Sequence, residues 1–279
     1  MQFKKTNNLE LISKYKIEKW ILPHLSTGKR GFSTKFDLVK IIQTIIKRLK
    51  TGCQWREISI KDYFGEEKIS WQNVYYFFNK WSRDGSFRNV WVHLLNRNRR
   101  MLDLSCVQLD GSQTRCRMGG ESTGYQSMKS AKTSNMIFLC DNRGQMLSMG
   151  NPRSGNHHDL HEIEDIMGEI IEILSEAEIS HKGLFLNADS GFDSKNLRQK
   201  LEMEEITGNI KINPRNRKTV DNDYYFDEKL YESRFKIEQA NAWLDGFKAL
   251  LIRFETLDIT WKAMHFLAFS LRLIKKLKV

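Results

Sequence analysis

Apolar residues recur at helical spacing in the first third of the chain. The clearest such stretch predicts a helix over residues 36–49, because its apolar positions repeat every three or four residues. Ser33 or Thr34 can begin this helix as a side-chain cap, and Gly52 can end it. This part of the chain is therefore expected to be helical.

Two further helices are predicted over residues 70–81 and 87–95, with Gly85 closing the first of them. The large aromatic residues of the 70–81 segment fall on one face, which is typical of a packed core rather than of a surface that stacks on bases. Three or four short helices with basic exposed faces predict a compact module of the helix-turn-helix type.

The pattern changes after the basic run at residues 96–100, where short apolar runs begin to alternate with amphipathic segments. Strands are predicted over 106–110, 135–140, 145–149, 183–188 and 205–212. Helices are predicted over 160–179, 194–203, 227–250 and 259–278. Strands, then alternating strands and helices, then terminal helices predict a mixed α/β sheet with helices on its faces.

Two aspartates each end one of the predicted buried strands. Asp110 closes the run at 106–110, and Asp189 closes the run at 183–189. A carboxylate at the end of a buried strand is costly unless something neutralises its charge, and a bound cation does so. Either aspartate alone is better explained as the cap of a turn or helix. Both together, with an acid on a later helix, favour a site for Mg²⁺.

That later acid is Glu238, which shares a helical face with Tyr231 and Arg234 at spacing i, i+3, i+7. Arg234 could pair with Glu238 or hold a phosphate. The alternative is a surface ion pair beside a packed tyrosine, which this spacing often produces. The three acids lie 79 and 49 positions apart, so only the fold can bring them together.

The net charge of +11 is carried by the first third of the chain. Residues 1–105 contain 21 Lys and Arg against 9 Asp and Glu, whereas residues 106–279 contain 24 against 25. A basic module joined to a near-neutral one indicates a polyanion-binding domain, 1–105, followed by a chemical domain, 106–279. Nucleic acid is the leading partner, and a merely solubilising surface is the alternative.

Several classes are disfavoured by the composition. The first residues lack the apolar core of a signal peptide, and no run of eighteen apolar residues could span a membrane. The four cysteines form no CxxC pair, so reduced thiols in the cytoplasm are expected rather than disulfides or a zinc site.

Three motifs together resemble the catalytic motifs of DDE transposases from bacterial insertion sequences. They are the segments 109–112 and 188–193 and the pattern Tyr231-x2-Arg234-x3-Glu238. The match is to the group with the Tyr-x2-Arg-x3-Glu signature, and most of all to its family-five type. Other segments also agree with that family, namely 51–56, 71–85, 155–159, 242–244 and 253–255.

The resemblance implies an RNase H-like fold for residues 106–279. Asp110 would lie on the first strand, Asp189 at the end of the fourth and Glu238 on a later helix. The three acids would hold two Mg²⁺ ions, for which Mn²⁺ can substitute, and catalyse DNA cleavage and strand transfer. The expected partners are the terminal inverted repeats of the element and target DNA. A homodimer in the bacterial cytoplasm, associated with the nucleoid, is expected as well.

The remaining candidates are contacts to DNA phosphates. These candidates are Tyr231, Arg234, Lys248, Lys129, Lys132, Arg215, Arg217 and Lys218. The chain departs from the family at Asp245, where many relatives carry a lysine or arginine. Lys248, one turn further, could take over that role.

Two other polar groups have competing interpretations. His157 and His158 with Asp159 could bind a metal or brace the site, but a polar loop in which Asp159 caps the next helix is favoured. Asp193 resembles a second acid, yet its place after the glycine favours capping of the following helix.

Two alternatives to a transposase remain open at this point. One is a nuclease of the same fold that cuts without joining strands. The other is a non-catalytic DNA-binding protein descended from such an enzyme, which the intact set of three acids argues against.

Overall fold

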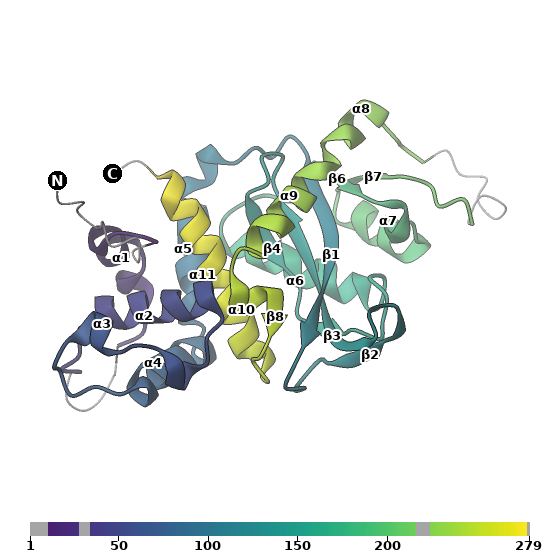
Figure 1. The fold of residues 1–279 in the computed structure, drawn as a ribbon. Helices are drawn as coiled ribbons and strands as arrows, with labels where there is room; N and C mark the ends of the chain where they lie inside the picture. The colour runs from purple at the N-terminus through teal and green to yellow at the C-terminus, as the bar shows by residue number, and fades with distance from the viewer. Residues whose placement is uncertain (1–10, 28–33, 216–223, 278–279) are drawn as a thin grey trace, which may run out of the picture. The chain divides into compact units, whose positions relative to one another are not determined.

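The computed structural model describes residues 11–27, 34–215 and 224–277, which form two compact units (Figure 1). The first unit comprises the chain up to Leu94 with Phe247–Leu250 and Ile259–Val279. The second comprises Leu95–Gly246 and Leu251–Asp258. Residues 259–277 thus fold with the N-terminal helices. The division into two functional domains after residue 105 stays a prediction.

The first unit is built from helices. They are α1 (Lys14–Trp20), η1 (Leu22–His24), α2 (Leu38–Thr51), η2 (Trp55–Glu57), α3 (Lys61–Phe64), α4 (Trp71–Arg83), α5 (Ser86–Asn98), α10 (Lys248–Leu251) and α11 (Asp258–Lys276). The last residues of α5, the last residue of α10 and the first residue of α11 already belong to the second unit.

Helix α2 shows how local sequence sets the ends of these helices. Its N-terminal cap is Asp37, whose Oδ1 accepts a hydrogen bond from the Val39 amide at 2.9 Å. The predicted cap at Ser33 or Thr34 is therefore wrong; an aspartate next to the first helical residue fills the role. The predicted end at Gly52 is confirmed, because this residue adopts the left-handed conformation with φ of 68°.

Helix α11 joins the N-terminal helices because it is apolar on almost every side. Its residues are buried over most of its length, and such a helix must be covered all round. Phe269 packs edge-on against Trp91 of α5, with ring centroids 5.5 Å apart. Lys16 of α1 donates to the carbonyls of Ile274 and Leu277 at 3.0 and 2.8 Å, which satisfies the C-terminal end of α11.

The second unit contains a mixed sheet. Its strands are β1 (Val107–Cys116), β2 (Gly124–Gln126), β3 (Ala131–Cys140), β4 (Met146–Met149), β5 (Arg153–Ser154), β6 (Phe185–Ala188), β7 (Thr207–Ile210) and β8 (Ile252–Arg253). The order of the main path is β2-β3-β1-β6-β7, with β4 and β5 beside β3 and β8 beside β1. Strands β1 and β3 are antiparallel, whereas β1, β6 and β7 run parallel.

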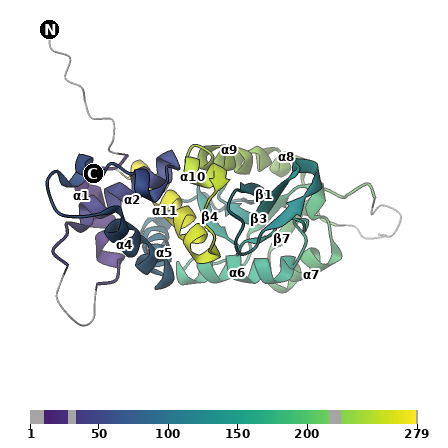
Figure 2. The ribbon, with the colours of Figure 1, turned by 60° about the horizontal axis from the view of Figure 1, so that its bottom comes forward.

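Helices cover both faces of this sheet, as Figure 2 shows, with α8 and α9 on one face and α6 and α7 on the other. The helical segments of the unit are η3 (Arg99–Met101), η4 (Ser127–Lys129), α6 (Ile163–Glu176), η5 (Ser190–Phe192), α7 (Lys195–Met203), α8 (Glu228–Tyr231), η6 (Glu232–Arg234) and α9 (Phe235–Leu244). The predicted mixed α/β sheet with flanking helices, preceded by a helical region, is confirmed.

One predicted helix is wrong in extent. The segment 227–250 is not continuous, because α9 ends at Leu244 and α10 begins only at Lys248. Asp245 and Gly246, two poor helix formers, lie at this break. The break separates the helix that carries Glu238 from the one that carries Lys248, and the two helices belong to different compact units.

Candidate functional site

The pairing register of two parallel strands brings Asp110 and Asp189 level with each other. Gln108 of β1 pairs with Asn187 of β6, and each aspartate lies two residues further along its own chain. Because side chains alternate between the faces of a sheet, residues two apart share a face. The two acids therefore lie on one face, where β6 has just ended and the Asp189 Oδ1 accepts from the Gly191 amide at 2.7 Å.

A helical segment crosses this face and brings the third acid near. The segment runs through α8, η6 and α9, and it carries Tyr231, Arg234 and Glu238 in that order. Asn241, one turn beyond Glu238, donates from Nδ2 to Asp110 Oδ2 at 3.3 Å. This hydrogen bond fixes where α9 passes over β1, and Glu238 lies on the adjoining turn.

Burial raises the pKa of Asp110 to about 6 from an ordinary value of 3.8. The Arg234 guanidinium opposes this rise, whereas the charges of Asp189 and Asp159 add to it. A half-buried carboxylate surrounded by other acids is an electrostatic position that a cation would stabilise. The site therefore has excess negative charge at neutral pH.

Burial also raises the pKa of the Tyr231 phenol. Arg234 lowers that pKa, while Asp189 and Glu238 raise it. Tyr231 is therefore a neutral hydroxyl at physiological pH, able to donate a hydrogen bond. The same charges act on Tyr231 and on Asp110, which places the side chains of the Tyr-Arg-Glu motif and the strand acids in one electrostatic environment.

The third acid is turned toward Arg234. The guanidinium of Arg234 forms an ion pair with the Glu238 carboxylate, whose side chain is 57% exposed. Within the described residues, no group of three or more His, Cys, Asp and Glu side chains is arranged to hold a metal ion. Asp110 and Asp189 are brought together by the sheet, and Glu238 is on the neighbouring helix but is engaged by its arginine.

The donor set nevertheless suits a divalent ion such as Mg²⁺. The candidate ligands are carboxylate oxygens, which are the ligands that hard cations prefer. The raised pKa of Asp110 shows that its negative charge lacks full compensation. Glu238 would have to leave its ion pair with Arg234 to join the two strand acids around such an ion.

Asp159 lies beside Asp110 but on the other face of the sheet. A side chain at Gly111 would come within 2.6 Å of the Asp159 Oδ1, and Gly111 faces opposite to Asp110 in the strand. Asp159 also accepts from Asn135 Nδ2 at 2.6 Å. The favoured prediction that Asp159 caps the next helix is wrong, because the residue that precedes α6 is Glu162.

The two histidines of this loop contact neighbours within it. The rings of His157 and His161 are stacked with centroids 3.7 Å apart, and His158 Nδ1 accepts from the Leu160 amide at 3.1 Å. Asp159 thus belongs to a loop that is stabilised by contacts among its own residues. This arrangement suits a loop that supports the acid site, which was one of the interpretations of this segment.

Asp193 is separate from the acid group. Its buried carboxylate accepts from Arg198 at 2.8 Å and from the Asn213 amide at 2.8 Å. The predicted cap role is wrong as well, since Ser194 caps α7. Asn213 also donates to the Ser190 carbonyl at 3.2 Å, so this network ties the chain that follows β7 to the residue after Asp189.

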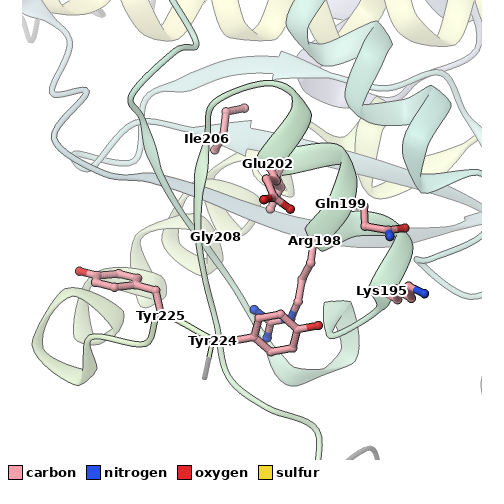
Figure 3. A pocket seen from close by; sticks show the side chains of 9 residues that line it. Lys195, Arg198, Gln199, Glu202, Ile206, Gly208, Tyr224 and Tyr225 are labelled. Carbon is pink, nitrogen blue, oxygen red and sulfur yellow. The ribbon is translucent and has the colours of Figure 1, made fainter. Parts of the chain in front are cut away.

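A cavity of about 510 Å³ lies between α7 and the residues that precede α8 (Figure 3). The Arg198 guanidinium carbon lies over the Tyr224 ring, 4.1 Å from the ring centroid, in a cation–π contact. None of the three acids lines this cavity. Arg198 is already engaged by Asp193 and by the Ile210 carbonyl at 3.0 Å, so the cavity is a gap beside a structural ion pair rather than the chemical site.

The predicted DNA contacts are spread over the chain. Lys129 is exposed in η4 and its Nζ donates to the Gln113 carbonyl at 2.7 Å, and Lys132 is exposed on β3. Arg215 is exposed after β7, whereas Arg217 and Lys218 lie outside the described residues. Lys248 belongs to the helical unit, where its backbone packs against Gly52.

The cysteines offer no nucleophile at this site. All four lie in the described part of the chain, and none of them forms a disulfide. Burial raises the pKa of the Cys106 thiol to about 11, so this residue is an unreactive thiol at neutral pH.

Sequence reasoning missed a set of polar residues that support the acids. These are Gln108, Asn187, Asn209, Ser233 and Asn241. A signal for Gln108 and Asn187 was present, because a single amide interrupts the apolar run at the start of β1 and the one in β6. Asn209, which follows Thr207 and Gly208 in β7, carried no such signal. The two residues on the helix carried no such signal, since polar residues are ordinary on a helix.

Comparison with known protein families shows the class to which this fold belongs. The model of the transposase DDE domain matches residues 97–273, so the chain belongs to the DDE transposases. The model of the IS4/5-family transposases (DUF4096) matches residues 15–91, which identifies the insertion-sequence group. The predicted family, enzyme class and RNase H-like architecture are confirmed.

Similarity to the solved structure of one transposase supports the fold. The chain is similar to the piggyBac transposase in its synaptic complex with hairpin DNA, with a TM-score of 0.52, 10% identity, and 95% of this chain and 73% of that chain covered. It is also matched to the Mos1 transposase paired-end complex with the left transposon end, with a TM-score of 0.30, 12% identity, and 88% and 80% covered. A search among curated proteins finds no match.

The helices of the described residues are all too short or too polar to cross a lipid bilayer.

Proposed function

We propose that this protein binds the ends of its insertion sequence and catalyses metal-dependent DNA cleavage and strand transfer through Asp110, Asp189 and Glu238. The observation that supports this most is the register of β1 and β6. This register aligns Asp110 with Asp189, and the helix that carries Glu238 crosses the same face of the sheet. Burial raises the pKa of Asp110 to about 6.

In this proposal the three carboxylates hold two Mg²⁺ ions, for which Mn²⁺ can substitute. When bound by these carboxylates, Mg²⁺ would supply Lewis-acid activation for an in-line displacement at phosphorus. Asp110 has to be deprotonated to contribute a ligand, and Glu238 has to exchange its ion pair with Arg234 for a place beside the strand acids. No covalent protein–DNA intermediate is involved.

Arg234 is the group that a DNA phosphate would engage when Glu238 is released. A guanidinium binds phosphate with two parallel hydrogen bonds, and here it already lies among the acids. Tyr231, a neutral phenol, supplies a hydrogen bond to the same strand. The exposed Lys129, Lys132 and Arg215 are proposed as further phosphate contacts.

The basic helical segment, residues 1–105, would recognise the terminal inverted repeats, and residues 106–279 would carry the chemistry. Cleavage at two ends followed by their joining to target DNA requires two active sites, so the working form is a homodimer. The excess of positive charge in residues 1–105 supports DNA recognition by this segment and catalysis by the other.

The test is a strand-transfer assay with the terminal repeats of the element, the purified protein and Mg²⁺. Joined products that disappear in the Asp189→Asn variant are expected. Nicks without joined products would indicate the nuclease instead. Binding without any cleavage would indicate a DNA-binding derivative. Short inverted repeats on both sides of the coding region would provide the substrate sequence.

A further inference from the structure

Three side-chain amides form a continuous hydrogen-bonded row across the strands β1, β6 and β7. Asn187 Nδ2 donates to Gln108 Oε1 at 2.9 Å, and Asn209 Nδ2 donates to Asn187 Oδ1 at 2.8 Å. All three side chains are completely buried. We call Gln108, Asn187 and Asn209 the amide row.

The amide row lies directly behind the acids. Gln108 is two residues before Asp110, and Asn187 is two residues before Asp189. Because of the alternation of side chains in a strand, both amides project from the same face as the acids that follow them. The row is thus the layer of side chains next to the candidate metal ligands.

The other side of the amide row holds the helical segment that carries Glu238. The Ser233 hydroxyl lies 3.1 Å from Gln108 Nε2 and 3.2 Å from Asn187 Nδ2. Asn187 Nδ2 also donates to the Leu230 carbonyl at 2.8 Å. Asn209 exchanges two hydrogen bonds with the backbone of Asp227, at 2.7 and 3.0 Å. Every member of the row therefore binds the segment from Asp227 to Ser233.

These contacts fix the rotation of the segment as well as its position. Ser233 immediately precedes Arg234, and a helical residue turns by about 100° relative to the previous one. The Ser233 hydroxyl accepts from Gln108 Nε2 and donates to the Leu230 carbonyl, which also accepts from Asn187. Together these contacts set one rotation of this turn, and that rotation directs Arg234 and then Glu238. Apolar side chains at the same places would pack equally well but would let the helix slide or turn.

From this geometry we infer that Ser233 and the amide row are positioning residues for the reaction. They act through Arg234 and Glu238, whose approach to Asp110 and Asp189 they set, and they touch neither metal nor DNA. The inference rests on the proposed function, because it assumes that these acids bind the metal. Outer-layer partners of metal ligands typically change metal affinity or activity by about 10- to 100-fold when removed.

The sequence provides a matched control. Ser148 on β4 is also buried, and its hydroxyl donates to the Ile170 carbonyl of α6 at 3.0 Å. It lies in the same unit as Ser233 but makes no contact with the amide row or the acids. Ser148→Ala and Ser233→Ala each remove one hydroxyl that bridges a strand and a helix.

The experiment compares Ser233→Ala, Ser233→Thr, Ser148→Ala and the unaltered full chain. Each is measured for single-turnover cleavage of terminal-repeat DNA, for DNA affinity and for Mn²⁺ affinity by calorimetry on the protein–DNA complex. Thermal unfolding is recorded for all four. Ser233→Ala is expected to lower the cleavage rate and Mn²⁺ affinity by about 10-fold or more. Its DNA affinity should stay within about two-fold, and Ser233→Thr should restore both losses.

Ser148→Ala is expected to lose stability without either change. The inference is overturned if Ser233→Ala cleaves and binds Mn²⁺ like the unaltered protein, or if Ser148→Ala loses both to the same extent. A failure of the proposed function is seen separately, because the unaltered protein would then not cleave its own terminal repeats.

Discussion

The two sides of the candidate site are held in different ways. On the sheet side, Asp110 and Asp189 are aligned by the backbone pairing of β1 and β6, which no side-chain rotation can alter. On the helix side, Glu238 is largely exposed and is held by a single ion pair with Arg234. Exposed pairs of this kind contribute little to stability, typically less than about 1 kcal/mol.

This difference indicates which side can adjust when substrate and metal bind. The positions of the strand acids are set by backbone pairing, and burial makes the ionised form of Asp110 costly, as its raised pKa shows. The helix backbone is also fixed, through Ser233 and the amide row, but the Glu238 side chain at its surface can change partner at small cost. The Glu238 side chain is thus the part of the proposed site that can change its contacts.

Loss of either kind of acid should have the largest effect. Asp189→Asn and Glu238→Gln are each expected to reduce cleavage by about 1,000-fold or more, which corresponds to about 4 kcal/mol of transition-state stabilisation. Terminal-repeat binding should persist in both. Single-turnover cleavage in Mg²⁺ measures the loss, and a Glu238→Gln variant that cleaves normally would remove the helix side from the site.

Neutralising the strained strand acid should stabilise the fold. The pKa of Asp110 moves from 3.8 to about 6 on folding, so its ionised form costs up to about 3 kcal/mol above pH 6. Asp110→Asn should recover part of this at pH 7.5 in metal-free buffer. The gain should shrink as the pH falls from about 6 to about 4 and vanish only below about pH 3, where the aspartate is protonated in both the folded and the unfolded state. Denaturant unfolding at the two pH values measures it, and equal stability at pH 7.5 would contradict the strain on the sheet side.

Breaking the Arg234–Glu238 pair should separate metal binding from DNA binding. In Arg234→Met, Glu238 loses its competing partner, and Mn²⁺ affinity without DNA should increase several-fold, by about 1 kcal/mol at most. DNA affinity should decrease, because a phosphate contact is lost. Calorimetric titration of Mn²⁺ into the DNA-free protein decides this, with Arg99→Met, in the remote pair with Glu178, as the control. An unchanged or weaker Mn²⁺ affinity would show that Arg234 does not compete for Glu238.

The smallest expected effect is on the pH profile of cleavage. Activity should decrease as the pH falls through about 6, because protonation removes Asp110 as a ligand. Asp159 is the weakest of the causes that raise this pKa, and it acts from the opposite face of the sheet. Asp159→Asn should therefore move the acidic limb slightly to lower pH. The pH profile is measured under single-turnover conditions. A shift of the acidic limb to higher pH would contradict this prediction and would show that the structural role of Asp159 in its loop outweighs its charge effect on Asp110.

The sequence by itself determined the elements and the candidates. Apolar periodicity located α2, α4 and most strands, and two apolar runs that end in aspartate identified Asp110 and Asp189. The spacing of Tyr231, Arg234 and Glu238 put them on one helical segment, and the order of the motifs along the chain indicated the family. These features are local, or are ordered along the chain, so they can be read without knowing which segments meet.

The tertiary structure decided what depends on partners distant in sequence. It aligned Asp110 with Asp189 across 79 residues, placed Asp159 beneath Gly111, and added α11 to the N-terminal helices. It also assembled Gln108, Asn187, Asn209 and Ser233 into one network, although nothing in their own segments shows that they meet. Hydrogen bonds and burial depend on which strands and helices pack together, and that pairing is a property of the whole fold rather than of any local pattern.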